Sequence, residues 1–153
     1  MRSTVKWILS ALLLGFGSPG QAGHETHGGD MAVALFYQYA DKIEACLNSV
    51  ATIRENPETM KAYIGTLNLV EVFSEDRTFI DGKEVDAINW PDVIAPKIFL
   101  NRSRWLVNSI PDTSRVVLVL HEMLSLMGFQ DFRYQYSNAW TQQMSGCLNR
   151  TRP

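Results

Sequence analysis

The chain has 153 residues, with 14 lysines and arginines against 16 aspartates and glutamates, so its formal net charge is −2 at pH 7. This length fits one domain with a single hydrophobic core. Basic residues form no cluster of the kind that nucleic acids require, and no apolar run approaches the roughly 20 residues that cross a bilayer. We therefore expect neither nucleic-acid binding nor a permanent membrane anchor.

Residues 1–22 have the pattern of a secretory signal peptide. Arg2 and Lys6 make the start positive, a short apolar stretch follows, and Gly20-Gln21-Ala22 offers small residues for cleavage. We therefore expect a periplasmic or secreted protein whose mature chain begins near Gly23. Without Arg2 and Lys6 the basic residues fall from 14 to 12 against 16 acidic ones, which gives a formal charge near −4.

Two cysteines, Cys46 and Cys147, would be carried into an oxidising compartment. Their spacing matches neither a redox pair nor a metal-binding pair, so a disulfide is the expected arrangement, and two buried free thiols are the alternative. The bond would close a loop of about 100 residues, for which the chain-entropy model gives up to about 4.7 kcal/mol of stabilisation.

The first predicted elements are helices. A Gly-rich leader, residues 23–30, is expected to be flexible, and residues 31–50 then place apolar side chains four apart, the pattern of an amphipathic helix. Asn56-Pro57-Glu58 combines a capping residue with a proline suited to the first helical turn. A second, shorter helix should begin there.

The pattern then changes to that of strands. Residues 69–73 are β-branched and aromatic, and Asp81-Gly82 between apolar residues is typical of a hairpin. Pro91 and Pro96 interrupt this region, so residues 97–100 are expected to form a separate short strand. The sequence predicts a small, mainly antiparallel sheet.

A central helix is predicted over residues 113–128, because its body is apolar on nearly every side. Gly128 suits a left-handed stop at its end. The candidate caps at its start are Asp112, Thr113 and Ser114.

A last helix is predicted to follow, capped by Ser137 and running to Cys147. Residues 31–153 are thus expected to form a single α+β domain: helices first, then the sheet, the central helix and the C-terminal helix.

The central helix carries the pattern H-E-x-x-S-x-x-G-x-x-D, from His121 and Glu122 through Ser125 and Gly128 to Asp131. It resembles the metal-binding helix of zincin metallopeptidases, in particular the metzincin pattern H-E-x-x-H-x-x-G-x-x-H/D. The resemblance implies that His121 and Asp131 would be metal ligands and that, in an active enzyme, Glu122 would be the catalytic base. It is also compatible with a zincin-like fold.

Ser125 stands where that pattern has its second histidine. A neutral hydroxyl is a poor zinc ligand in place of imidazole, which leaves two ligands from the motif. We therefore expect no resident cofactor and no active metallopeptidase, with zinc as the ion that a surviving site would bind. His24 or His27 is the alternative source of a third ligand, although an unstructured tail is the favoured interpretation of both.

A second group of polar and aromatic residues follows the predicted strands. We predict a binding cleft in which one arginine pairs with Glu122 or Asp131; the proposed lining is Trp90, Arg102, Arg104, Trp105 and Tyr134. The alternative is that the aromatic rings fill the core and the charges face water.

The leading functional hypothesis is a non-catalytic zincin-like domain that acts through binding or structure, with a peptide or another exported protein as its partner. A metal-dependent, peptidase-like hydrolase with a third ligand from outside the motif is the first alternative. An interaction module of the cell envelope is the second. The chain is also similar to small uncharacterised exported bacterial proteins, a resemblance that implies a compartment but no activity.

Overall fold

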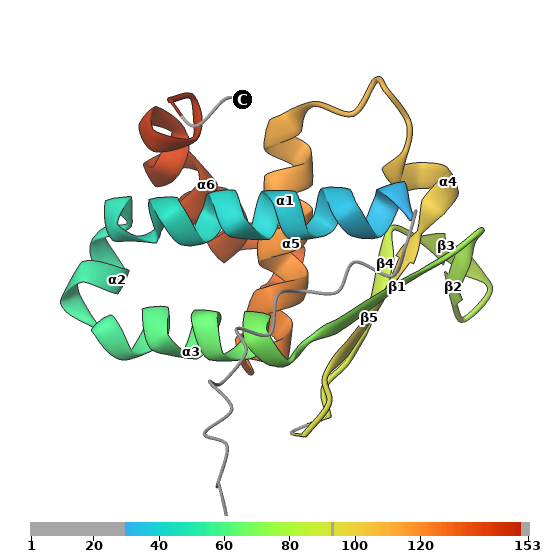
Figure 1. Cartoon of the computed structure of the whole chain (residues 1–153), viewed down its shortest axis with the longest axis horizontal. Coiled ribbons are helices and arrows are strands. Elements are labelled where there is room, and N and C mark those ends of the chain that lie inside the picture. Colours follow the sequence, from blue (N-terminus) through green and yellow to red (C-terminus); the bar gives the residue numbers. More distant parts are fainter. Residues whose placement is uncertain (1–29, 93, 151–153) are drawn as a thin grey trace, which may run out of the picture.

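The computed structural model describes residues 30–92 and 94–150 (Figure 1). The predicted signal peptide, His24 and His27 lie outside these residues. The helical elements are α1 (Met31–Cys46), η1 (Leu47–Ser49), α2 (Ala51–Glu55), α3 (Pro57–Leu69), α4 (Arg102–Trp105), α5 (Asp112–Leu126), η2 (Phe132–Tyr134) and α6 (Gln135–Leu148). The strands are β1 (Glu71–Glu75), β2 (Thr78–Ile80), β3 (Lys83–Val85), β4 (Ala87–Trp90) and β5 (Lys97–Asn101). The predicted α+β class is confirmed.

Helix α5 runs through the middle of this fold. It contacts α1, α3, α6 and strand β4, and α1 crosses it at a steep angle (Figure 1). Its buried apolar side chains are Val116, Val119, Leu120, Met123 and Leu124. The prediction of a central helix is therefore confirmed. Burial of these apolar side chains is the main source of stability for a helix of this kind.

The start of α5 differs from the prediction. Its capping position is Pro111, which has no polar side chain, and the first residue of the helix, Asp112, accepts a hydrogen bond from Tyr39 Oη at 2.6 Å. The expected caps were wrong, because they lie inside the first turn: Asp112, Thr113 and Ser114.

The end of α5 follows the prediction. Gly128 has φ +84°, the left-handed conformation that favours glycine, and its N–H donates to Ser125 O at 3.0 Å. The next N–H, from Phe129, donates to Leu124 O at 2.9 Å. These bonds satisfy the last carbonyl groups of α5 and turn the chain towards α6.

The main sheet has three strands in the order β1-β5-β4. Strand β4 pairs antiparallel with β5, and β2 pairs antiparallel with β3 around Asp81 and Gly82, which have φ +50° and +75°. The predicted hairpin is therefore confirmed. Strands β1 and β5 are parallel, which makes the main sheet mixed.

One face of this sheet packs on the helices. Val72, Ile98 and Leu100 are buried on that face, whereas Phe73 and Phe99 stack on the opposite face with ring centroids 5.4 Å apart. Because side chains alternate along a strand, Asn89, which is paired with Ile98, shares the helix-facing side. This register directs a polar side chain towards α5.

A disulfide joins Cys46 at the end of α1 to Cys147 in α6, with Cα atoms 5.7 Å apart and a sequence separation of 101. The predicted pairing is confirmed, and the alternative of two free thiols is wrong. No helix within residues 30–92 and 94–150 has the length and apolar character needed to cross a membrane.

Candidate functional site

His121 and Glu122 lie on α5 where this helix meets strand β4, and both line a pocket of about 440 Å³. Of the residues predicted to form a site, Arg104 and Tyr134 line the same pocket. The other lining residues come from β2, β3, β4 and the segment between β3 and β4: Ile80, Glu84, Val85, Asp86, Ala87, Ile88 and Asn89.

Asp131 lies behind His121 and links α5 to α6. Its Oδ2 lies 3.1 Å from His121 Nδ1, and its Oδ1 accepts hydrogen bonds from the N–H groups of Tyr136 at 2.7 Å and Ser137 at 3.4 Å. The carboxyl group thus caps the start of α6, a role that the sequence assigned to Ser137. That assignment was wrong, because Ser137 is the third residue of the helix.

The Asp131 side chain is 0% exposed. Burial raises the pKa of Asp131, but hydrogen bonds from Ser137, His121 and the backbone N–H of Tyr136 outweigh burial and place this pKa below its usual value. The ionised carboxylate therefore accepts from His121 Nδ1–H and leaves Nε2 as the ring nitrogen for a ligand.

Tyr134 packs on His121, with ring centroids 4.3 Å apart and an angle of 42° between the planes. Two consecutive residues produce this contact by adopting left-handed backbone conformations, Arg133 with φ +52° and Tyr134 with φ +60°. Such conformations are strained for residues other than glycine and occur preferentially at functional sites. The strain is held in place by the Asp131 cap and by a hydrogen bond from Tyr134 N to Asp131 O at 3.1 Å.

Glu122 is 5% exposed and receives a hydrogen bond from Asn89 Nδ2 to Oε2 at 2.8 Å. Burial raises the pKa of Glu122, and the Asn89 hydrogen bond and the nearby His121 oppose this rise only in part. A buried carboxyl group of this kind, beside a histidine in a pocket, is a feature of functional sites.

Arg104 forms another wall of the pocket. Its Nε lies 2.8 Å from Asp86 Oδ1, and its Nη1 donates to Glu84 O at 3.0 Å. The predicted pairing of an arginine with Glu122 or Asp131 is therefore wrong, since Arg104 is held by the segment that carries Asp86.

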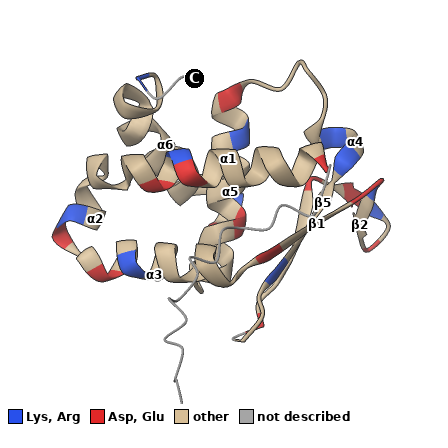
Figure 2. Ribbon diagram, viewed as in Figure 1, with Lys and Arg blue, Asp and Glu red and all other residues tan. Residues whose placement is uncertain are grey.

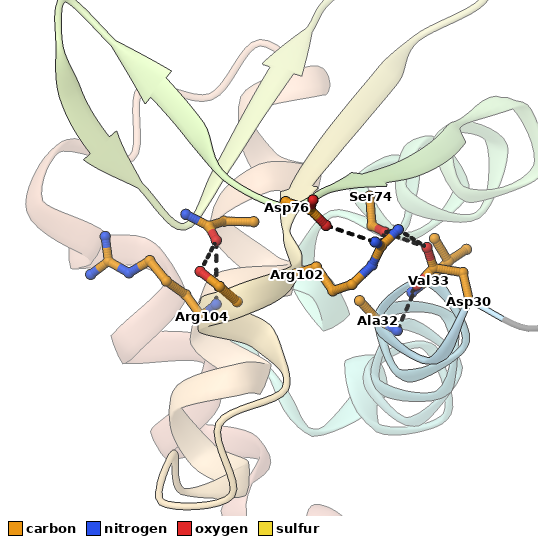
Figure 3. Close-up of polar contacts among 9 residues, drawn as sticks. Asp30, Ala32, Val33, Ser74, Asp76, Arg102 and Arg104 are labelled. Atoms are coloured by element: carbon orange, nitrogen blue, oxygen red, sulfur yellow. Dashed lines mark hydrogen bonds and ion pairs between the residues drawn. The ribbon is translucent and has the colours of Figure 1, made fainter.

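Arg102 belongs to a separate cluster, although both arginines come from α4 (Figure 2). Arg102 points towards Asp30, Ser74 and Asp76, and Arg104 points away from this group (Figure 3). Arg102 Nη2 lies 2.9 Å from Asp30 Oδ2, and Arg102 Nη1 lies 3.0 Å from Asp76 Oδ1. Arg102 therefore does not line the His121 pocket, contrary to the prediction.

Asp30 was predicted to end a flexible leader, and the structure corrects this. Its Oδ1 accepts from the N–H groups of Ala32 at 2.9 Å and Val33 at 3.4 Å, and so caps α1, while Oδ2 accepts from Ser74 and Arg102 (Figure 3). The described chain is thus fixed to β1 and α4 from its first residue.

The two tryptophans of the predicted cleft have different environments, and neither lines the His121 pocket. Trp105 is 1% exposed, and its Nε1–H donates to Asp86 O at 3.0 Å, so it belongs to the core. Trp90 is 64% exposed at the end of β4. The alternative that aromatic residues fill the core was correct for Trp105.

Asn89 and Asp86 belong to the polar and aromatic segment that the sequence marked near the cleft, but they were not among its predicted lining residues. The signal for Asn89 was the alternation along β4, which places it on the same side as Ala87. A polar residue at such an inward position requires a polar partner, and Glu122 is that partner.

The described residues do not form a zinc site with three protein ligands. They contain no group of three or more histidine, cysteine, aspartate or glutamate side chains that could hold a metal ion. Asp131 contacts the Nδ1 side of His121 and caps α6 with its other oxygen, so its carboxylate is occupied as a partner of the imidazole. A carboxylate in this position orients a histidine and does not share a metal with its Nε2.

No protein-family model matches this chain, and comparison with curated proteins and with solved structures also gave no match. The zincin-like part of the fold prediction therefore has no support from a structural neighbour.

Proposed function

We propose that this protein is an exported, non-catalytic binding domain whose pocket retains the His-Glu pair of a degenerate zincin-like helix. The observation that carries the proposal is the contact between His121 and Asp131, the two remaining ligand candidates of the motif. They bind each other and α6, and the pocket beside them is open to a ligand. The proposed ligand is a peptide or a segment of another exported protein.

Two further features support this proposal. The disulfide between Cys46 and Cys147 fits a protein that functions in an oxidising compartment. Ser125 supplies a hydroxyl group where a second imidazole would be required, so a catalytic zinc ion would have too few strong ligands.

Metal analysis of the purified protein tests the proposal. After dialysis, the wild type should retain far less than one equivalent of zinc, and Ser125→His should gain zinc affinity, because it places a second imidazole one turn from His121. Ser125→Ala is the matched control and should resemble the wild type. Stoichiometric zinc in the wild type that is lost in His121→Ala would overturn the proposal.

A metal-dependent hydrolase is the second candidate function. The observation that favours it is Glu122, whose pKa is raised by burial and which lines the same pocket as His121. In this case the ligands in addition to His121 would have to include residues outside the described ones, with His24 and His27 as candidates. Hydrolysis of a peptide library that is abolished both by a chelator and by Glu122→Gln would establish this function in place of the first.

A further inference from the structure

The charges around the His121 pocket are unbalanced. Among its lining residues Glu84, Asp86 and Glu122 carry carboxyl groups, and Arg104 is the only lysine or arginine. Asp131 adds a fourth carboxylate behind His121. Arg104 is paired with Asp86, and Glu84 lies 3.8 Å from Arg77, which is not a lining residue. Among the described residues, Glu122 is therefore the lining carboxyl group that forms no ion pair with a lysine or arginine.

We propose that this pocket receives the positively charged side chain of a peptide ligand, an arginine or a lysine. This inference rests on the proposed binding function and names the chemistry of its ligand. A guanidinium or ammonium group would supply the positive charge that the lining lacks and would donate hydrogen bonds to a carboxylate.

Glu122 is the anchor that the geometry assigns to this cation. Its only hydrogen bond from a described residue reaches Oε2, from Asn89, so Oε1 has no donor among these residues. The Glu122 side chain is buried as a whole, but Oε1 is not among the described atoms that are fully buried and lack a hydrogen-bond partner. Because Oε1 has no partner, this means that it keeps some exposure to solvent. A carboxylate held on one side by an amide, with its other oxygen towards a pocket, is a preorganised acceptor.

The rings of His121 and Tyr134 provide a second contact for a cation. They lie 4.3 Å apart on the wall of the pocket, and the strained backbone of Tyr134 fixes this arrangement before any ligand arrives. Aromatic faces attract guanidinium and ammonium groups. Charge and ring contacts therefore favour the same class of ligand.

The surroundings of the pocket indicate a peptide as the carrier of the cation. Asp86, Arg104 and Tyr134 also line a neighbouring groove of about 780 Å³. This groove runs along α5 and α6, with Ile110, Pro111, Val117 and Leu118 among its lining residues. A peptide with its basic side chain beside Glu122 would continue into this largely apolar groove.

Calorimetric titration of the full mature protein with short peptides tests the proposal. The peptides share a Gly, Ser and Ala sequence and differ at one central position, which is Arg, Lys, Ala or Glu. We expect the Arg and Lys peptides to bind at least about tenfold more tightly than the Ala peptide, equivalent to about 1.4 kcal/mol, and the Glu peptide to bind more weakly still.

Glu122→Gln is the decisive variant, because it keeps the shape of the side chain and an oxygen for Asn89 but removes the charge. It should abolish most of the preference for Arg over Ala. Glu71→Gln is the matched control, since Glu71 is an exposed carboxylate on β1 that pairs with Lys97 outside the pocket. That variant should bind as the wild type does. Circular dichroism and the intact disulfide verify that both variants are folded.

The outcomes separate this inference from the proposed function. Equal binding of the Ala and Arg peptides would overturn the inference and leave the binding function intact. No binding of any peptide, together with stoichiometric zinc, would overturn both. Agmatine, a free guanidinium compound, serves as a further probe; if it binds as tightly as the Arg peptide, a peptide is not the carrier of the cation.

Discussion

Asp131 shows how one buried side chain organises this site. Its two oxygens hold elements that are separate in sequence, because one contacts His121 on α5 and the other accepts N–H groups at the start of α6. A buried carboxylate is costly unless it is fully hydrogen-bonded, and these contacts satisfy it. The orientation of the His121 ring therefore depends on the same group that begins α6.

Replacing Asp131 by alanine should lower the free energy of unfolding by about 2 to 3 kcal/mol, because α6 loses its cap and His121 loses its charged partner. Urea denaturation at neutral pH measures this change. His121→Ala removes only the imidazole contact and should cost less. A double-mutant cycle between the two positions isolates their coupling, and a loss below about 0.5 kcal/mol in Asp131→Ala would contradict the dual role.

The backbone conformation of the segment between α5 and α6 also depends on Asp131. Three of its residues, Gly128, Arg133 and Tyr134, have positive φ angles. Glycine adopts this conformation without cost, whereas the other two are held in it by the Asp131 cap. The turn therefore stores strain next to the pocket, at the residue whose ring contacts His121.

Arg133→Gly should stabilise the protein by roughly 0.5 to 1 kcal/mol. The Arg133 side chain is exposed, so its removal costs little packing, and glycine relieves the left-handed strain while losing more entropy on folding. Gly128→Ala is the opposite test, because its Cβ would meet open space and any loss of stability would come from φ alone. A destabilised Arg133→Gly variant would show that this backbone conformation is not strained.

The hairpin at Asp81-Gly82 and the end of α5 at Gly128 were predictable, because local backbone conformation determines both. The parallel pairing of β1 with β5 was not, since it depends on how distant segments pack on α5. The sequence also did not predict that Asp131 caps α6. Asp131 precedes the first turn of this helix, and Ser137 was the capping residue nearer to the predicted helix.

The candidate site was predictable in part, because the spacing of its motif is a local feature of the sequence. The spacing of the motif marked His121, Glu122 and Asp131, and the structure brings the first two to one pocket with Asp131 behind them. The arginines of α4 could not be assigned from sequence, because their pairing depends on tertiary neighbours. Arg102 is held by Asp30 and Ser74, and Arg104 by Asp86.

Helix α1 is held in place at both of its ends. Asp30 caps its start and pairs with Arg102, and Cys46 at its end is bonded to α6. The disulfide therefore connects the first described helix to the last one, and α5 contacts both of them. Because α6 also carries the Asp131 cap, the disulfide lies at the far end of a helix that helps to position the pocket.

Removing the disulfide should destabilise the protein strongly without removing the pocket. In the double variant Cys46→Ser with Cys147→Ser, the unfolded chain regains the freedom of a loop of 101 positions, for which the chain-entropy model gives a loss of up to about 4.7 kcal/mol. Urea denaturation of the oxidised wild type, the reduced wild type and the double variant measures the effect, and the last two should agree. The bond restrains the far end of α6, while Asp131 and the first turn of that helix hold His121 directly. Peptide binding by the folded fraction should therefore persist, and a folded double variant that no longer binds would show that the pocket itself depends on the bond.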